Sequence, residues 1–180
     1  MEVRPVEAGD CRAICNIYNH YIENTVISFE MEPLTTGDME QRVAACTATY
    51  PWLVCVAGDT VVGYAYANRW QVRCAYRQCV ETTVYLDPGH LGKGCGQLLY
   101  AALLPRLTRQ GLHTAVAGIA LPNAASIRLH ERMGFRQVAQ FAQVGFKQGR
   151  WIDVGYWQKM LGDAAEKGER ELPEQEVEHG

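Results

Sequence analysis

Apolar and polar positions alternate with different spacing in successive parts of the chain, and each spacing predicts a type of element. Two stretches carry apolar side chains every three or four positions, as helices packed on one face do: residues 14–22 and 36–49. Asp10 stands where it can cap the first helix, and Pro51 follows the second. Four other stretches are rich in β-branched and aromatic residues, which indicates strands: residues 3–6, 52–57, 60–70 and 79–86.

The later part of the chain continues the alternation of elements. We expect a helix over residues 94–110 that Gly111 ends, a buried strand over 113–120, and a short helix over 123–133 that Gly134 ends. Two further strands form a closing antiparallel pair: residues 135–144 and 151–159. This order of elements indicates one mixed α/β domain built on a single central sheet.

Length and composition agree with a single domain. A chain of 180 residues, of which 48% are hydrophobic, can bury one substantial core. No apolar run approaches the ~18 residues that cross a bilayer, and the first residues lack the basic and apolar regions of a signal peptide. We therefore expect a cytoplasmic protein without a membrane partner.

The charge is distributed unevenly along the chain. Residues 162–180 hold seven acidic and two basic side chains, so the rest of the chain has fifteen basic against thirteen acidic residues, although the whole carries −3. This small positive excess is not typical of a nucleic-acid surface, but it is compatible with local basic spots that receive phosphates. We expect a folded domain over residues 1–161 and a disordered acidic tail over 162–180.

The seven cysteines argue against two kinds of site. Their number is odd and no two are spaced as C-x-x-C, which speaks against both a complete disulfide framework and a zinc site. We expect reduced thiols, most of them small core residues, and no metal. The cysteines stand at positions 11, 15, 46, 55, 74, 79 and 95.

The segment from His90 to Tyr100 joins a glycine-rich turn to a helix directly after a strand-like run. Glycines at 92, 94 and 96 allow a tight turn with unobstructed N–H groups, and the first helical turn adds free N–H donors and the positive end of the helix dipole. Two familiar phosphate loops do not fit, because G-x-x-x-x-G-K-[ST] is missing and Gln97 stands where a dinucleotide fingerprint needs glycine. The segment therefore predicts a pyrophosphate cradle of another kind.

Glu81 lies inside an expected strand. Period-two alternation places Glu81 on one face together with Thr83 and Tyr85, and it places Thr82 on the other face. A carboxylate within a sheet is costly unless it has partners or a chemical task. Two interpretations remain open: an edge-facing or ion-paired glutamate, and a general base beside the glycine turn.

A second pattern follows the strand over residues 113–120. The spacing N-x-x-S-x-x-L-x-x-x-x-G-F runs from Asn123 to Phe135. Asn123 can cap the helix, as an asparagine in any protein can, or it can contact a coenzyme. His130 within this helix is most simply a packing residue with satisfied hydrogen bonds, and a relay role is the alternative.

Together these patterns resemble one protein family. The glycine turn and the Asn123 helix are similar to the two acetyl-CoA contact regions of the GNAT superfamily of N-acetyltransferases. Further strings narrow the resemblance to its phosphinothricin N-acetyltransferase group, which includes enzymes that acetylate methionine sulfoximine and methionine sulfone: residues 17–21 (IYNHY), 50–54 (YPWLV), 63–66 (GYAY), 80–85 (VETTVY), 121–123 (LPN), 128–131 (RLHE) and 149–154 (GRWIDV). The resemblance covers residues 2–161.

The resemblance implies a GNAT-type α/β fold, in which a mixed central sheet of about seven strands is flanked by about four helices and opens in a V-shaped splay between the fourth and fifth strands. Acetyl-CoA would lie in this splay, and the amine would attack the thioester directly in a ternary complex without an acyl-enzyme. By position, Glu81 would be the catalytic base. The coenzyme would be bound by the strand end, the glycine turn and the second helix: Val84, Tyr85, Leu86, Gly92, Lys93, Gly94, Cys95, Gly96, Gln97 and Asn123.

The resemblance also implies a pocket for a small amino-acid analogue. Its residues would be Phe29, Gln71, Arg73, Glu81, Thr82 and Thr83. Arg73 offers two parallel hydrogen bonds to a phosphinate or carboxylate, although a solvated loop arginine is the plain alternative. Leu91 departs from the superfamily, which usually has Gln or Arg there, and Gln71 stands where relatives can have a basic residue. We therefore expect weaker coenzyme binding, and anion recognition that depends more on Arg73.

Three functions remain open from the sequence. The first is acetylation of the α-amine of phosphinothricin, methionine sulfoximine or methionine sulfone. The second is a GNAT enzyme with another amine acceptor, such as a protein N-terminus or an aminoglycoside. The third is a non-catalytic acyl-CoA sensor, against which the presence of Glu81 speaks. Because the group commonly forms dimers, the resemblance implies a homodimer with a small-molecule amine substrate.

Overall fold

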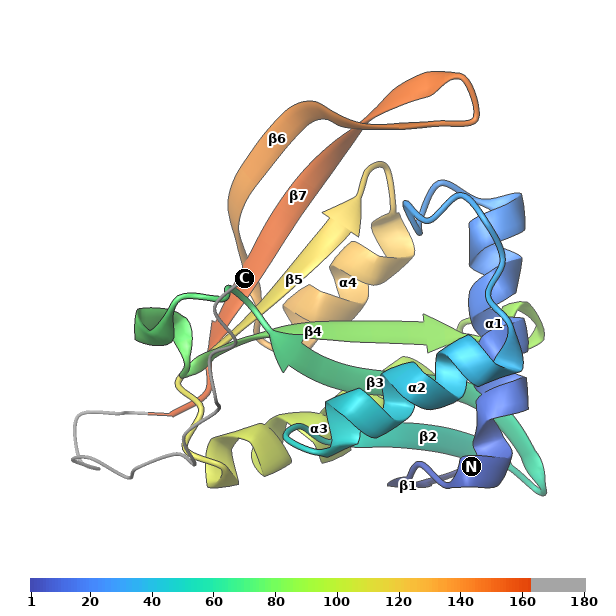
Figure 1. Ribbon diagram of the computed structural model, residues 1–180. Helices are drawn as coiled ribbons and strands as arrows, with labels where there is room; N and C mark the ends of the chain where they lie inside the picture. Colours follow the sequence, from blue (N-terminus) through green and yellow to red (C-terminus); the bar gives the residue numbers. More distant parts are fainter. Residues whose placement is uncertain (163–180) are drawn as a thin grey trace.

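A seven-stranded sheet forms the centre of the protein in the computed structural model, which describes residues 1–162 (Figure 1). The strands are β1 (Glu2–Pro5), β2 (Trp52–Ala57), β3 (Thr60–Arg69), β4 (Cys79–Leu86), β5 (Thr114–Ala120), β6 (Arg136–Lys147) and β7 (Arg150–Met160), in the sheet order β1-β2-β3-β4-β5-β7-β6. The helices are α1 (Cys11–Asn24), α2 (Thr36–Thr47), α3 (Cys95–Arg109) and α4 (Ala124–Arg132), with three short 3-10 helices, η1 (Ala8–Asp10), η2 (Cys74–Tyr76) and η3 (Pro88–His90). Apart from Gly162, the acidic tail expected from the sequence lies outside the described residues.

Strands β4 and β5 run parallel and separate soon after they pair. Their register covers three residue pairs and ends at Glu81↔Val116. β4 then continues to Leu86 and β5 to Ala120, and the two strands diverge in Figure 1. Because β3 pairs with β4 as far as Leu86, the main chain of β4 after Glu81 keeps one edge open toward β5. The expected splay between the fourth and fifth strands is confirmed.

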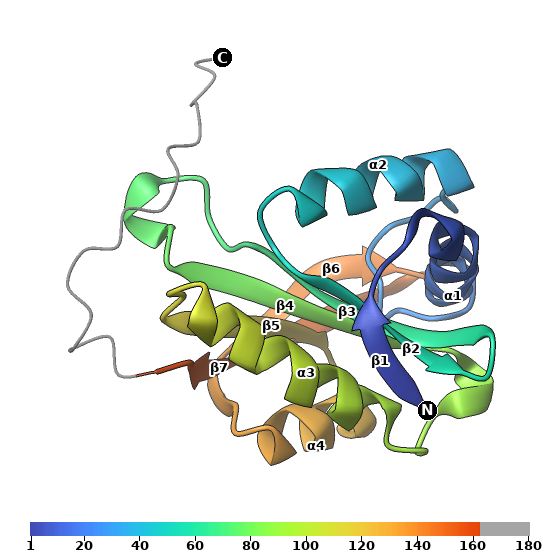
Figure 2. The ribbon, with the colours of Figure 1, turned by 90° about the horizontal axis from the view of Figure 1, so that it is seen from below.

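Helices cover the sheet from both sides (Figure 2). The core on the side of α3 and α4 contains Val80, Leu99, Leu103, Ala117 and Trp157. The core on the side of α1 and α2 contains Ile14, Met39, Trp52, Val54 and Tyr64. Removal of these side chains from water is the main force that holds the layers together. On the α1 and α2 side the helices lie over β2 to β4, whereas β6 has mostly exposed side chains, so this face of the sheet is half open.

Local sequence signals predict most element boundaries. The strands over 52–57 and 79–86 agree residue for residue with β2 and β4. Gly111 and Gly134 follow α3 and α4 with φ values of 82° and 86°, which are left-handed conformations that favour glycine. None of the helices within residues 1–162 has the length and apolar character needed to span a membrane.

Asp10 does not cap α1, so that expectation is wrong. Its carboxylate accepts a hydrogen bond from the N–H of Glu7 at 2.8 Å and pairs with Arg4 at 2.7 Å. These contacts close η1 and hold the backbone of Asp10 in the helical region, so its side chain makes no capping bond to α1. A nearby arginine and a free N–H compete with the helix for this side chain.

The last hairpin is longer than the sequence pattern predicts. β6 reaches Lys147 and β7 begins at Arg150, so only two residues form the turn. These residues, Gln148 and Gly149, have φ values of 51° and 74°, as a tight two-residue hairpin turn requires. Glycine at 145 weakens the strand signal there, which explains why the pattern places the end of the strand at residue 144.

Candidate active site

Glu81 occupies the last position of β4 that pairs with β5, at the point where the two strands separate. Its side chain is partly buried, and within residues 1–162 it makes no hydrogen bond or ion pair. Burial raises the pKa of this carboxyl group above the ordinary value of a glutamate. An unpaired carboxylate with a raised pKa is suited to accept a proton near neutral pH. The ion-paired interpretation of Glu81 thus finds no partner in the described part of the chain.

Tyr156 of β7 lies close to Glu81, and the sequence pattern does not single it out. Burial, followed by the charge of Glu81, raises the pKa of the Tyr156 phenol. The two residues lie on different strands, and Gly118 of β5 stands between them. Their proximity depends on the register between β5 and β7, and no local motif in the sequence contains that information.

The glycine turn leads into α3 as predicted. Gly92 and Gly94 have φ values of 74° and 85°, and a Cβ placed on either would meet no atom within 4 Å. The first hydrogen bond of α3 runs from the N–H of Leu98 to the carbonyl of Gly94 at 3.1 Å. The N–H groups of residues 95–97 precede this bond and lie at the positive end of the helix dipole. An open turn with free main-chain donors has the chemistry that a diphosphate needs.

Gly96 and Cys95 also have structural tasks in the first turn of α3. A Cβ on Gly96 would lie 2.8 Å from Cδ2 of Leu129, so glycine lets α3 and α4 approach closely. Cys95 is fully buried, and burial raises its pKa to about 12, so its thiol is a poor nucleophile. All seven cysteines are free and five are buried, which confirms the expectation of core thiols.

Asn123 caps α4, because its Oδ1 accepts a hydrogen bond from the N–H of Ser126 at 3.1 Å. Its side-chain nitrogen has no partner within residues 1–162, so the same residue can also donate to a ligand. His130 is buried, with its Nε2 2.8 Å from Oη of Tyr100 and its Nδ1 2.8 Å from the carbonyl oxygen of Ser126. Burial lowers the pKa of His130, and the packing interpretation of this residue is confirmed.

Two of the expected pocket residues on β4 point in opposite directions. Thr83 lies on the face of Glu81, opposite Tyr66 of β3. Thr82 lies on the other face and is only 3% exposed. Its hydroxyl is 3.3 Å from the carbonyl oxygen of Val116, to which it donates. The structure therefore does not bring the side chain of Thr82 together with Glu81.

Gln71 and Arg73 lie in the exposed segment between β3 and β4. Arg69, at the end of β3, holds the start of this segment by donating hydrogen bonds to the carbonyl groups of Gln71 and Val72. The guanidinium of Arg73 has no partner within residues 1–162 and is available to an anion.

Phe29 belongs to the loop between α1 and α2, and this loop is fastened to the last hairpin. The Phe29 ring packs directly on Gly145 of β6, where any side chain would collide with it. Lys147 is only 4% exposed, and its Nζ donates hydrogen bonds to the carbonyl groups of Ile22 at 2.6 Å and Ser28 at 2.7 Å. The loop and the hairpin therefore form one connected wall beside the open half of the sheet.

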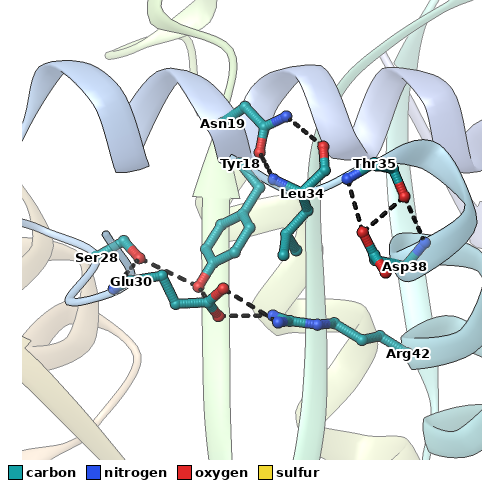
Figure 3. A network of polar contacts seen from close by, with 8 residues as sticks. All are labelled: Tyr18, Asn19, Ser28, Glu30, Leu34, Thr35, Asp38 and Arg42. Atoms are coloured by element: carbon teal, nitrogen blue, oxygen red, sulfur yellow. Dashed lines mark hydrogen bonds and ion pairs between the residues drawn. The ribbon is translucent and has the colours of Figure 1, made fainter. Parts of the chain in front are cut away.

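A polar network fixes the same loop from its other side (Figure 3). Glu30 accepts a hydrogen bond from Oη of Tyr18 at 2.8 Å and pairs with Arg42 of α2 through contacts of 2.6 and 3.0 Å. Asn19 of α1 binds both the N–H and the carbonyl group of Leu34, at 2.9 and 2.8 Å. Such paired charge-assisted and main-chain contacts restrict the loop that carries Phe29.

Comparisons with known proteins point to one kind of protein. The family model described as an acetyltransferase (GNAT) domain matches residues 3–155. The chain is 42% identical over 159 residues to a phosphinothricin N-acetyltransferase of Streptomyces viridochromogenes, covering 88% of this chain and 87% of that protein. It is 40% identical over 169 residues to an L-methionine sulfoximine/L-methionine sulfone acetyltransferase of Salmonella typhimurium, covering 92% and 97%. A solved structure of a GNAT superfamily phosphinothricin acetyltransferase from Sinorhizobium meliloti, in complex with AcCoA, matches with a TM-score of 0.90 at 35% identity, covering 94% and 93%.

Proposed function

Because the chain belongs to the GNAT acetyltransferase family, whose members use acetyl-CoA, we propose that it transfers the acetyl group to the α-amine of a small amino-acid analogue. The acceptor is of the phosphinothricin, methionine sulfoximine or methionine sulfone type. Relatives named for these compounds support this substrate class, since they match this chain over nearly its whole length.

The observation that carries the proposal is the position of Glu81. A partly buried carboxylate without a partner in the described part of the chain stands where the two strands of the splay separate, and the open turn of α3 follows the same strand. A protein that only binds the coenzyme gains nothing from such a group, which destabilises the fold. The position therefore favours an enzyme over a sensor.

Three segments supply donors and acceptors that fit acetyl-CoA. The open edge of β4 at residues 84–86 offers main-chain groups for the pantetheine arm. The N–H groups of residues 92–97 suit the diphosphate, and the free side-chain nitrogen of Asn123 adds one more donor. Leu91 offers only its main chain, so we expect weaker binding than in relatives with Gln or Arg at that place. When bound, acetyl-CoA supplies an acetyl group activated as a thioester.

The protein's own part in the reaction concerns the proton of the amine. Glu81 accepts a proton from the acceptor's ammonium group, directly or through a water molecule. The free amine then forms a C–N bond to the acetyl carbon while the C–S bond breaks. The nitrogen gives up a second N–H proton, and the departing thiolate takes up one proton to become the free thiol of CoA. The amine attacks in a ternary complex, so no side chain carries the acetyl group. Holding both reactants in this geometry contributes much of the acceleration.

We assign recognition of the acceptor's anionic group to Arg73. Its guanidinium is exposed, unpaired within residues 1–162, and lies in a segment that Arg69 fixes at the end of β3. A planar guanidinium binds a carboxylate or phosphinate through two parallel hydrogen bonds. Phe29 and Thr83 belong to the same proposed pocket.

Release of free CoA with a panel of amines tests the proposed substrate class. The panel contains phosphinothricin, methionine sulfoximine, methionine sulfone, an aminoglycoside and a short peptide with a free N-terminus. We expect the highest kcat/KM with one of the amino-acid analogues. Turnover confined to the aminoglycoside or the peptide would reject the substrate class, and CoA binding without any turnover would identify a sensor.

The variant Glu81→Gln tests the mechanism separately. Loss of the base should lower kcat at neutral pH by about 10²–10⁴-fold, while the Kd for CoA stays unchanged. Because burial raises the pKa of Glu81, the wild-type rate should rise with pH through a pKa above that of an ordinary glutamate, and this rise should vanish in the variant. Glu40→Gln on the exposed side of α2 is the control. An unchanged kcat in Glu81→Gln rules out the base.

We also propose that the folded domain spans residues 1–161 and forms a homodimer in the cytoplasm. Exposed apolar side chains on the last hairpin support the dimer: Val138, Phe141, Val144, Phe146 and Trp151. Free thiols at all seven cysteines support a reducing compartment.

A further inference from the structure

Gly118 is exposed in the middle of β5, although the residues on both sides of it in this strand are buried. Its φ is not in the left-handed region, unlike that of Gly92 or Gly94, so the backbone conformation does not require glycine. The strand is an interior one, between β4 and β7. A glycine at such a position marks a place where another molecule can approach the main chain closely.

The space above Gly118 is bounded by an acidic and an aromatic side chain. A Cβ placed on Gly118 would lie 3.5 Å from Oε1 of Glu81 and 3.4 Å from Cε1 of Tyr156. Tyr156 is directly opposite Gly118 in the register of β5 and β7, and Glu81 is the last residue of β4 that pairs with β5. The missing side chain therefore leaves a small hollow, here called the Gly118 pit, between these two groups.

Two other rings hold Tyr156 in position. Trp70, just after β3, and Phe141 of β6 each contact the Tyr156 ring edge to face, with centroids 5.6 Å apart and interplanar angles of 77° and 79°. The hydroxyl of Tyr156 has no hydrogen-bond partner within residues 1–162. An ammonium group is attracted both by a carboxylate and by the faces of aromatic rings, so this side of the pit suits a cationic amine.

We propose that the Gly118 pit receives the acceptor's α-amine and that Tyr156 is a substrate-contacting residue that limits the size of the amine. This inference rests on the proposed function and names the part of the protein that selects the amine. For direct proton transfer the amine must come within hydrogen-bond reach of Glu81, and the pit is the space directly beside Oε1 of that residue. A primary amine fits beside the bare main chain, whereas an N-methyl amine needs room that the Tyr156 ring occupies.

The variant Gly118→Ala tests the pit with little risk to the fold. The added Cβ meets its neighbours at ordinary contact distances, and the backbone φ allows alanine. We expect the KM for the amine to rise about tenfold or more, as one extra carbon in a fitted pocket does, while the Kd for CoA stays unchanged. The control is Gly37→Ala in α2, whose Cβ would lie 3.7 Å from Oγ1 of Thr35, and which should change neither value.

Substitutions of Tyr156 and of the substrate complete the test. Tyr156→Phe keeps the ring and should retain the wild-type KM for the amine, whereas Tyr156→Ala should raise it and reduce discrimination against the N-methyl derivative of the same acceptor. Isothermal titration of methionine sulfone into the enzyme saturated with CoA gives a readout that needs no turnover. It should show the same weakening in Gly118→Ala.

The outcomes separate this inference from the proposed function. If the wild-type enzyme accepts an amino-acid analogue and Gly118→Ala leaves its KM and Kd unchanged, the pit is overturned and the function stands. If Gly118→Ala weakens CoA as much as the amine, the pit belongs to the coenzyme site and the inference is also overturned. If the wild-type enzyme acetylates a different amine instead, the substrate class fails, and the same comparison with that amine decides the pit.

Discussion

At the scale of single residues, the candidate site contains residues that lower the stability of the fold. Glu81 is a partly buried carboxylate that has no partner among residues 1–162, and Gly118 leaves one position of an interior strand without a side chain. Neither contributes to the core, and a more stable sequence would replace both. Residues that break the local rules of folding in this way are expected where a protein binds a ligand or performs chemistry.

The cost of Glu81 can be measured through pH. In the unfolded chain this group ionises near the ordinary glutamate pKa of about 4.3, whereas burial raises the pKa in the folded state. Between these two values the folded state holds the proton more tightly, so the free energy of unfolding falls as pH rises and stays lower above both. Glu81→Gln does not titrate, so its advantage in stability should be small near pH ~4 and larger near pH ~7.5. Urea unfolding at both pH values measures the difference in the free energy of unfolding between the variant and the wild type. An equal difference at the two pH values contradicts the prediction.

The sequence identifies residues whose signal is local. Glu81 stands out as a charge within an alternating strand, and Asn123 stands out as a cap at the start of a helix. Tyr156 and Gly118 give no such signal. They are 38 positions apart in the sequence, and their contact depends on the pairing of β5 with β7. For Asp10 the local signal is misleading. The sequence predicts a helix cap, but the carboxylate pairs with Arg4 instead.

At the scale of elements, the junction of the glycine turn with α3 determines coenzyme binding in our proposal. Gly94 has a φ of 85° and an open surrounding, so Gly94→Ala would act through backbone strain alone, at about 1–2 kcal/mol. Gly58, in the turn between β2 and β3, has a φ of 60° and an equally open surrounding, which makes Gly58→Ala a matched control. Both variants should lose similar stability in thermal unfolding, but only Gly94→Ala should raise the Kd for CoA. Equal affinities for CoA in the two variants would separate the turn from the coenzyme site.

The contact between the α1–α2 loop and the last hairpin depends on Lys147. Its buried ammonium group binds two carbonyl groups, so Lys147→Met would leave both acceptors without a partner. We expect a loss of about 2–3 kcal/mol in the free energy of unfolding, and a higher KM for the amine because Phe29 is no longer held against Gly145. Lys159→Met on β7, where the lysine is partly exposed, is the control for loss of charge. Wild-type stability of Lys147→Met in urea would show that the two hydrogen bonds are dispensable.

Elements could be predicted from the sequence better than their arrangement. Spacing of apolar residues locates β2, β4 and α2 within two residues, because each pattern is contained in the element itself. The insertion of β7 between β5 and β6 has no local signal, since it depends on which strand edges meet after the core has formed. The splay between β4 and β5 could be predicted only from the resemblance to a family, because the spacing of apolar residues does not show which main-chain groups stay unpaired.

At the scale of the whole molecule, helices cover only half of the face of the sheet on which Glu81 lies, and the other half is open. α1 and α2 lie over β2 to β4, and Glu81 stands at the border beyond which β5, β7 and β6 are open (Figure 1). Contacts of Phe29 and Lys147 join the loop between α1 and α2 to the last hairpin. An acceptor would therefore enter from the open half, opposite the layer formed by α3 and α4.

The open half ends in a hairpin whose apolar side chains suggest a second subunit. Phe146 and Trp151 are 56% and 60% exposed, and their rings contact each other at an interplanar angle of 60° with centroids 5.1 Å apart, in the hairpin that includes the edge strand β6. Sedimentation velocity should show a dimer for the wild type and a monomer for the double variant Phe146→Glu/Trp151→Glu. The interface would otherwise bury carboxylates of both subunits without a partner of opposite charge, which is costly. Met31→Glu replaces a residue that is 67% exposed on the α1–α2 loop, and it should leave the dimer intact. Since the hairpin also borders the proposed acceptor pocket, the monomeric variant should show a raised KM for the amine and an unchanged Kd for CoA. A wild type that sediments as a monomer at micromolar concentration would refute the dimer.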